Sequence, residues 1–181
     1  TPTGSELKAG SQTDIAFTQA FITSQGQCAA TLANMDPSTT KAGIDQTNLK
    51  HYISFGGASG TMLAESCQTP DALEAQYEAV YKTYAGPNLL GFDFDIEGGA
   101  PTNATLLKNL PLALKEFHNK HPNVEIWLTL ATMPDGLTDA KTAVQAVVDA
   151  GAPITGVDLM AMDYGRDSTD TAFMANSAIS S

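Results

Sequence analysis

Acidic and apolar residues alternate in the segment Leu89-Leu90-Gly91-Phe92-Asp93-Phe94-Asp95-Ile96-Glu97. Side chains of a β-strand alternate between its two faces with a period of two. The three acids therefore share one face of this strand, and the intervening Phe and Ile side chains share the other. The apolar face suits helices packed outside a parallel sheet. The acidic face is then expected to point inward, toward the axis of a barrel or the crevice of an open sheet.

The acidic row indicates a function. Successive acids along the row, Asp93, Asp95 and Glu97, have Cβ atoms about 6.6 Å apart, at ~3.3 Å per residue. In a low-dielectric site they repel one another, so at least one should hold a proton near neutral pH. The structural alternative is an exposed edge strand with solvated acids, which leaves the regular alternation of the two Phe without a reason. Two chemistries use such a row, binding of a hard divalent cation and general acid catalysis with a shared proton.

The position of the row favours acid catalysis over metal binding. No His lies near this strand, and His51, His118 and His121 are scattered and expected at surfaces or interfaces. No metal and no cofactor are therefore expected. Glu97 is the last of the acids, and the C-terminal ends of parallel strands carry the active sites of α/β proteins. Gly98-Gly99 follow and open the backbone for a ligand.

The rest of the chain alternates between strands and helices. Five strands are expected, at 15–22, 52–55, 89–96, 125–132 and 154–162. Helices are expected from Thr69 as N-cap to 85, from 102 to 117, from 138 to 150, and from 167 or 168 onward. This order predicts parallel βαβ units, in an open doubly wound sheet or a (β/α) barrel. A full barrel has eight strands and about 250 residues, more than the 181 residues here.

Charge and composition limit the classes of partner that the protein is expected to bind. The chain has 9 basic and 20 acidic residues, a net charge of −11, which argues against nucleic acid and anionic membranes as partners. No apolar run is long enough for a transmembrane helix, and the first residues lack the pattern of a signal peptide, which leaves a cytosolic protein or a removed signal. The two cysteines, Cys28 and Cys67, are either buried free thiols or one disulfide.

Four segments together carry a family resemblance. Residues 90–97 resemble the D-x-x-D-x-D-x-E signature of glycoside hydrolase family 18, the chitinases and their relatives. Ser54-Phe55-Gly56-Gly57 is similar to that family's S-x-G-G strand end, residues 129–134 to its strand five, and residues 160–165 to its strand-six motif. The order and spacing also agree, over nearly the whole chain.

The resemblance implies retaining hydrolysis with substrate assistance. Glu97 would protonate the glycosidic oxygen and then act as base. Asp95 would first share a proton with Asp93 and then bond the acetamido N–H of the substrate. The acetamido oxygen, positioned by Tyr164, would be the nucleophile and form an oxazolinium. Asp163 would help to bind the same sugar, provided that its strand twists at the end.

Further substrate-binding candidates follow from the same motifs. Alternation predicts that Met160, Met162 and Tyr164 share an inward face, so Met162 is one candidate. Gly56 and Gly57 of the S-x-G-G segment are the others.

The sequence departs from the family pattern in two ways. Leu90 stands where the signature has its first acid, which alters the support for Asp93. The chain starts at the family's strand two and stops after strand six, so residues 1–181 are predicted to be a partial catalytic TIM-barrel domain with about five of eight βα units, a fragment of a longer chitinase. The family uses a Trp from strand eight beneath the sugar. The one Trp here, Trp127, is expected to pack between strand and helix, with lining of a subsite as the alternative.

The implied substrate is chitin or chitooligosaccharides, cleaved at β-1,4-linked N-acetylglucosamine. An extracellular location follows from that substrate and favours a Cys28–Cys67 disulfide. The protein is expected to be a monomer if the full barrel is present, with no nucleic-acid or membrane partner. The alternatives are an endo-β-N-acetylglucosaminidase acting on N-linked glycans, a non-catalytic carbohydrate-binding protein on the same fold, and a divalent-cation site on an open sheet.

Overall fold

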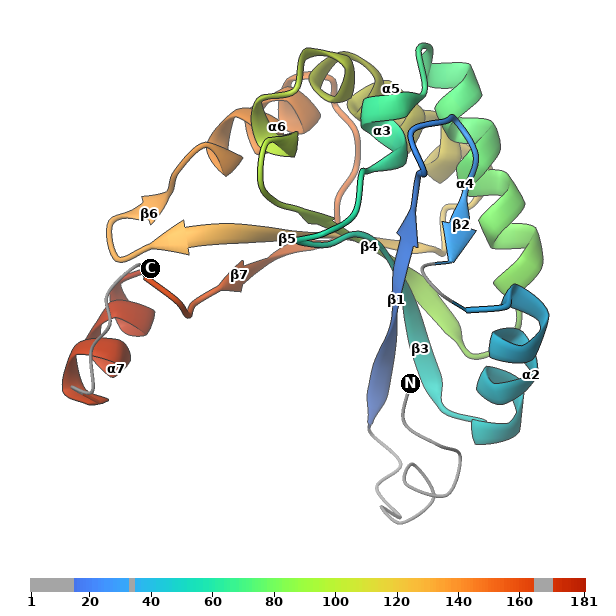
Figure 1. Ribbon diagram of the computed structural model, residues 1–181, viewed down its shortest axis with the longest axis horizontal. Coiled ribbons are helices and arrows are strands. Elements are labelled where there is room, and N and C mark those ends of the chain that lie inside the picture. The colour runs from blue at the N-terminus through green and yellow to red at the C-terminus, as the bar shows by residue number, and fades with distance from the viewer. Residues whose placement is uncertain (1–14, 33–34, 165–170) are drawn as a thin grey trace.

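The computed structural model describes residues 15–32, 35–164 and 171–181 (Figure 1). The strands are β1 (Ala16–Thr23), β2 (Thr31–Leu32), β3 (Lys50–Gly56), β4 (Leu89–Ile96), β5 (Glu125–Met133), β6 (Gly136–Leu137) and β7 (Gly156–Met160). The helices are α2 (Pro37–Thr47), α3 (Leu63–Ser66), α4 (Pro70–Tyr84), α5 (Ala104–Lys120), α6 (Ala140–Asp149) and α7 (Thr171–Ser180), with a 3₁₀ turn, η1 (Ala100–Thr102).

Five strands form a parallel sheet in the order β1-β3-β4-β5-β7. The predicted parallel βαβ architecture is therefore confirmed, with all five expected strands present. The short strands β2 and β6 add antiparallel pairs to β1 and β5 and were not expected, because pairs of two residues leave no hydrophobic pattern. Helices α3 to α6 cover the convex side of the sheet, whose concave side is open (Figure 1). The described residues thus form part of a barrel wall that does not close.

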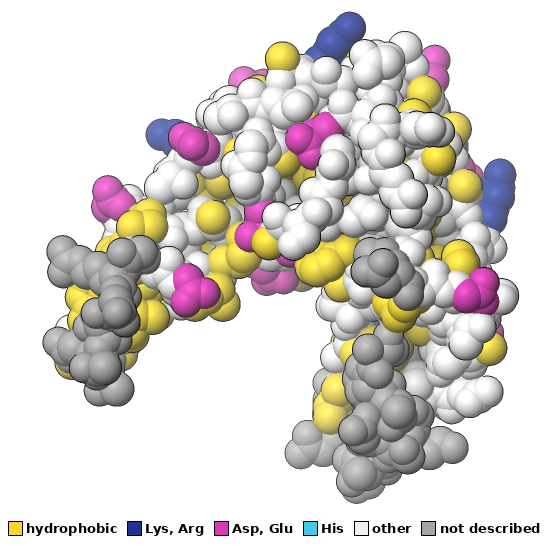
Figure 2. All heavy atoms as spheres, in the orientation of Figure 1, with side chains coloured by type: hydrophobic (Ala, Val, Ile, Leu, Met, Phe, Trp, Pro, Cys, Tyr) yellow, Lys and Arg dark blue, Asp and Glu magenta, His cyan; other side chains and the backbone are white. Residues whose placement is uncertain are grey.

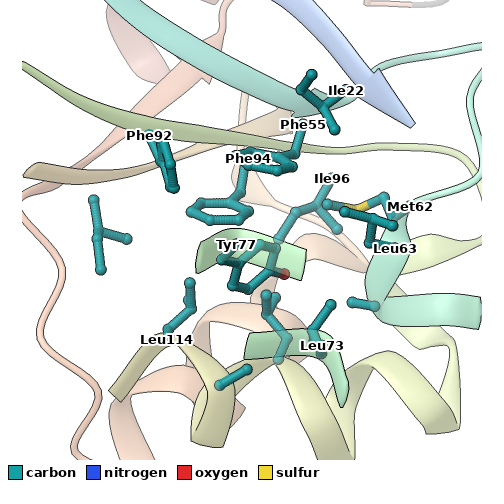
Figure 3. Packing of buried hydrophobic residues seen from close by; sticks show 14 of the residues in the cluster. Ile22, Phe55, Met62, Leu63, Leu73, Tyr77, Phe92, Phe94, Ile96 and Leu114 are labelled. Carbon is teal, nitrogen blue, oxygen red and sulfur yellow. The ribbon is translucent and has the colours of Figure 1, made fainter. Parts of the chain in front are cut away.

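Aromatic packing holds the sheet to the helices on the convex side (Figure 3). Phe92 and Phe94 of β4 are fully buried. Phe94 stacks on Phe55 of β3 at 5.0 Å between ring centroids, and Phe92 stacks on Phe117 of α5 at 5.0 Å. Tyr77 of α4 meets the Phe94 ring edge-on at 5.3 Å. The apolar face predicted for the acidic strand therefore packs against helices, which leaves the acids on the concave side.

The helix starts follow local capping chemistry. Thr69 caps α4, as predicted, because its hydroxyl accepts a hydrogen bond from the Ala72 N–H at 3.2 Å. The next long helix, α5, begins later than expected. Asn103 is its cap and accepts from two backbone N–H groups, since the preceding residues form the turn η1. The expected start of the last helix, at 167 or 168, lies outside the described residues. No described helix is long and apolar enough to cross a membrane.

His51 is a core residue, and its expected surface or interface position is wrong. It is 3% exposed and stacks on Phe17 at 5.6 Å between ring centroids. Strand alternation explains the difference, because His51 shares the helix-facing side of β3 with Ile53 and Phe55. Burial lowers the pKa of the His51 imidazole.

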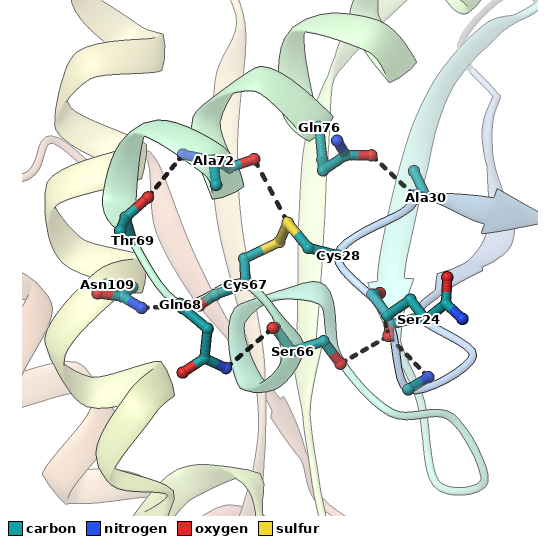
Figure 4. The surroundings of a disulfide bond; sticks show 12 residues. Ser24, Cys28, Ala30, Ser66, Cys67, Gln68, Thr69, Ala72, Gln76 and Asn109 are labelled. Carbon is teal, nitrogen blue, oxygen red and sulfur yellow. Dashed lines mark hydrogen bonds between the residues drawn. A yellow bond between two sulfur atoms is a disulfide. The ribbon is translucent and has the colours of Figure 1, made fainter.

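Cys28 and Cys67, for which the sequence leaves two alternatives open, form a disulfide across 39 residues (Figure 4). The bond joins the connection between β1 and β2 to the junction of α3 and α4.

Gly91 provides a test of the sheet packing. Its position on β4 is in register with Glu125 of β5, and a Cβ there would lie 2.3 Å from the Glu125 carbonyl oxygen. Gly91→Ala should therefore force the two strands apart and lower the free energy of unfolding by about 1–3 kcal/mol, measured by urea denaturation. The matched control is Gly86→Ala, because a Cβ at Gly86 meets nothing within 4 Å. A loss for Gly91→Ala no larger than that of the control would contradict this packing.

Candidate active site

The acidic row lies in the middle of the parallel sheet, on β4 between β3 and β5. Asp93, Asp95 and Glu97 follow one another toward the C-terminal end of the strand, with the alternation that the sequence predicts. Figure 2 shows the molecule as an arch, and the concave side of the sheet lines its hollow. The structure therefore brings these three predicted site residues together.

Asp93 is fixed by one hydrogen bond from each neighbouring strand. Its Oδ2 accepts from the Ser54 hydroxyl of β3 at 2.5 Å, and its Oδ1 accepts from the Thr129 hydroxyl of β5 at 2.7 Å. Burial raises the pKa of Asp93, while these two bonds act in the opposite direction because they stabilise the carboxylate. Both oxygens are thus occupied, and the carboxylate has a single defined position.

Asp95 is more buried and less supported than Asp93. It is 7% exposed, and its Oδ1 has no hydrogen-bond partner among the described residues. Burial, followed by the charges of Glu97 and Asp93, raises the pKa of Asp95 to about 7. A buried carboxylate oxygen without a donor is costly. Asp95 therefore has a strong tendency to take up either a proton or a donor group from a ligand.

Glu97 is the first residue after β4 and is half-buried. Its backbone carbonyl accepts from the Ala100 N–H at 3.1 Å, which closes the turn into η1. Gly98 and Gly99, which follow it, are exposed. Glu97 therefore lies at the rim of the acidic row, where a ligand can reach it from solvent.

Gly56 and Gly57 support the backbone of Asp95. Gly56 stands opposite Asp95 in register with φ 102°, and a Cβ on it would lie 2.2 Å from the Asp95 carbonyl oxygen. Gly57, with φ 84°, donates its N–H to the same carbonyl at 3.1 Å and is covered by the Phe21 ring. Both glycines are buried. Their predicted contact with substrate stays a prediction, while their contact with Asp95 explains why glycine is needed.

Of the strand-six motif, residues 161–164 follow the end of its strand, and residue 165 lies outside the described residues. β7 ends at Met160, and the Met162 N–H turns back to the Met160 carbonyl at 2.8 Å. The expectation that Met162 and Tyr164 continue the inward alternation is therefore wrong. Met162 is 52% exposed, and Asp163 is exposed with φ 52°.

Tyr164 is buried, and its hydroxyl is hydrogen-bonded to the Ser181 hydroxyl, just after α7, at 2.9 Å. The described hydrogen bonds do not join Tyr164 to the acids of β4. The roles proposed for Tyr164, Asp163 and Met162 at the substrate stay predictions.

Trp127 faces the concave side, and the expected packing between strand and helix is wrong. Along β5, Leu128 and Ile126 face the helices, whereas Trp127 and Thr129 lie on the opposite side with the acids. The alternation of the strand contains this information. The Trp127 ring packs on Gly156 of β7, where a Cβ would lie 2.5 Å from it.

A polar network that was not predicted lies around Gly91, two residues before Asp93 on β4. Oε2 of Glu125 accepts from the Tyr52 hydroxyl at 2.6 Å and from the Trp127 Nε1–H at 2.9 Å. These bonds lower the pKa of Glu125, and burial, together with Glu125, raises the pKa of Tyr52 to about 12. Tyr52 can reach across β4 because the residue between them is Gly91. The network joins distant strands, so no local pattern in the sequence predicts it.

The network borders a cavity of about 260 Å³ on the concave side. It is lined by Ala16, Thr18, Tyr52, Asp93, Trp127, Thr129 and Asp158. Asp158 of β7 adds a further negative charge that raises the pKa of Asp93. Among the described residues, no group of three or more His, Cys, Asp or Glu is arranged to hold a metal ion.

The raised pKa of Asp95 has a consequence for stability. A carboxyl whose pKa is higher in the folded than in the unfolded chain makes its full contribution to the stability of the fold at pH values below its unfolded-state pKa. This contribution is lost as the pH rises through the folded-state pKa, which is about 7 for Asp95. Asp95→Asn should therefore raise the melting temperature at pH 8 and change it little at pH 3.5. Asp149→Asn, at an exposed carboxylate, is the control. Equal shifts for Asp95→Asn at the two pH values would refute the raised pKa.

Comparisons with known proteins show a likeness to chitinases. No family model matches the chain. It is 36% identical over 119 residues to a probable bifunctional chitinase/lysozyme of Escherichia coli and to Endochitinase 11 of Metarhizium anisopliae. These matches cover 63% of this chain, but only 13% and 22% of the two relatives.

The structure is similar to a solved chitinase domain. The match is active domain 2 of a thermostable chitinase from Pyrococcus furiosus, a catalytic-site mutant complexed with chito-oligosaccharides, with 25% identity and a TM-score of 0.78. It covers 97% of this chain and 56% of that one. The predicted incomplete (β/α) barrel is therefore confirmed. The predicted resemblance to chitinases is confirmed as well, for a chain that spans 56% of this solved domain.

Proposed function

We propose that this chain is the catalytic part of a chitinase that hydrolyses β-1,4-linked N-acetylglucosamine with substrate assistance and retention. One observation carries the proposal: the Asp95 carboxylate is buried between Asp93 and Glu97 in the acidic row, and its Oδ1 has no partner among the described residues. The names of the two relatives and the chito-oligosaccharide complex of the Pyrococcus domain support the substrate class.

The first step uses the rim acid. Glu97, protonated, gives its proton to the glycosidic oxygen as the bond to the anomeric carbon breaks. The acetamido oxygen of the same sugar attacks that carbon and forms an oxazolinium, so no protein carboxylate is needed as nucleophile. Water then attacks the anomeric carbon, Glu97 takes its proton, and the oxazolinium ring opens. Two displacements at one carbon give retention.

Asp95 is suited to stabilise this intermediate. Its free Oδ1 can accept the acetamido N–H, which becomes more acidic as the oxazolinium forms. A pKa raised to about 7 favours the protonated form of Asp95 more than that of an ordinary carboxyl. In the proposed mechanism Asp95 shares this proton with Asp93. Asp93 is fixed by Ser54 and Thr129, so its carboxylate stays in place while the proton is shared. Tyr164 would position the acetamido oxygen after releasing Ser181.

An extracellular location belongs to the same proposal. Chitin is an insoluble polymer outside most cells, and disulfides such as Cys28–Cys67 persist in oxidising compartments. A net charge of −11 suits a neutral polymer better than an anionic one.

Glu97→Gln tests the acid directly. It keeps the size of the side chain but removes the transferable proton, so kcat on a chromogenic chitooligosaccharide should fall by about 10²–10⁴-fold while KM changes little. The full-length protein is assayed, with Glu116→Gln, an exposed Glu on α5, as control. Equal kcat values for Glu97→Gln and the parent protein would exclude Glu97 as the acid. Binding of chitooligosaccharides by the parent without any hydrolysis would instead indicate a carbohydrate-binding protein.

A further inference from the structure

The connection between β3 and α3, residues 57–62, lies against the acidic site. At its start, the Gly57 N–H donates to the Asp95 carbonyl at 3.1 Å. At its end, Met62 packs on Gly56, with its Cγ 3.2 Å from where a Cβ would be. The tip, Ala58 and Ser59, is exposed. This connection therefore joins the backbone of Asp95 to the surface that a substrate would meet.

The same connection is glycine-rich and needs external support. Gly57 and Gly60 within it, and Gly56 before it, have more backbone freedom than other residues. Segments of this kind open locally at low free-energy cost unless other contacts hold them. Besides its local bonds, such as that from the Met62 N–H to Glu65, this connection is held by contacts from the segment that follows β1.

Ser24, which follows β1, is the first contact (Figure 4). Its N–H donates to the Thr61 carbonyl at 2.8 Å, and its Oγ lies 2.6 Å from the Ser66 Oγ. The Ser24 hydroxyl proton is directed to the Gln27 carbonyl at 2.7 Å, so the Ser66 hydroxyl is the donor in the serine pair. Ser24 is 5% exposed, which protects these bonds from competition by water.

The Cys28–Cys67 disulfide is the second contact, one residue beyond Ser66 (Figure 4). Cys67 is fully buried, and its carbonyl accepts from the amide of Asn109 on α5 at 2.8 Å. The Cys28 sulfur packs 3.6 Å from the Ala72 carbonyl oxygen of α4. The disulfide therefore attaches the segment after β1 to two helices of the convex layer.

We infer that the serine pair and the disulfide act together as a clamp, Ser24–Ser66 with Cys28–Cys67, that positions residues 57–62 and, through Gly57, the backbone of Asp95 for substrate binding. This inference rests on the proposed function. The clamp residues touch no reacting atom and are positioning residues. When the clamp is lost, residues 57–62 open in part of the molecules. Since only the closed fraction binds substrate, KM rises while kcat at saturation is unchanged.

The test compares Ser66→Ala, the double variant Cys28→Ala/Cys67→Ala, and Thr83→Ala as control. Thr83→Ala removes a side-chain hydrogen bond from α4 without touching the clamp. Amide hydrogen exchange is measured on the full-length protein without substrate. The Gly57 and Ser24 amides should exchange about tenfold faster in both clamp variants, with the Leu128 amide of β5 and the control unchanged. Hydrolysis of a chitooligosaccharide should show KM raised about threefold or more, with kcat within about twofold.

Two results would overturn the clamp. One is exchange of the Gly57 and Ser24 amides at the parent rate in both variants. The other is equal acceleration at Leu128, which would mean a general loss of stability. Ser66→Ala keeps the test decisive if the double variant does not fold. The exchange measurement needs no substrate, so it tests the clamp separately from the proposed function. If the parent protein hydrolyses no chitooligosaccharide, the proposed function is wrong, but the exchange rates can still support the clamp.

Discussion

Burial and electrostatic repulsion act together on the three carboxylates of the acidic row, Asp93, Asp95 and Glu97. Asp95 is almost completely buried beside two other acids, which disfavours its ionised form and raises its pKa to about 7. The strand tolerates this because its other face is locked by aromatic packing, with Phe92 and Phe94 fully buried beneath the helices. The hydrophobic side of β4 thus stabilises an arrangement that its polar side opposes.

The degree of support decreases along the acidic row. Asp93 is held through both oxygens, by Ser54 and Thr129. Asp95 has a fixed backbone but a free Oδ1, because Gly57 donates to its carbonyl and no described donor reaches that oxygen. Glu97 lies at the rim. This order, from a fixed carboxylate to an accessible one, matches the proposed roles. Asp93 holds a proton, Asp95 stabilises the acetamido group, and Glu97 transfers a proton to the glycosidic oxygen.

Sequence reasoning succeeded where a local period carries the information. The alternation of β4 placed its acids and its Phe side chains on opposite faces correctly, and Thr69 caps α4 as predicted. It failed at Trp127, although the same period-two rule applies there, and at His51, which lies outside the strand predicted at 52–55 but inside β3. The bonds from Ser54 and Thr129 to Asp93 could not be predicted, because they depend on the register of three strands.

Burial between two acids should leave Asp95 with a share in a proton near neutral pH. The most direct measurement is an NMR titration of the Asp95 carboxyl carbon in the parent protein and in Glu97→Gln. We expect a pKa near 7 in the parent and a lower value in the variant, which lacks the charge of Glu97. A pKa near the ordinary value of about 4 in the parent, or no change in the variant, would contradict it.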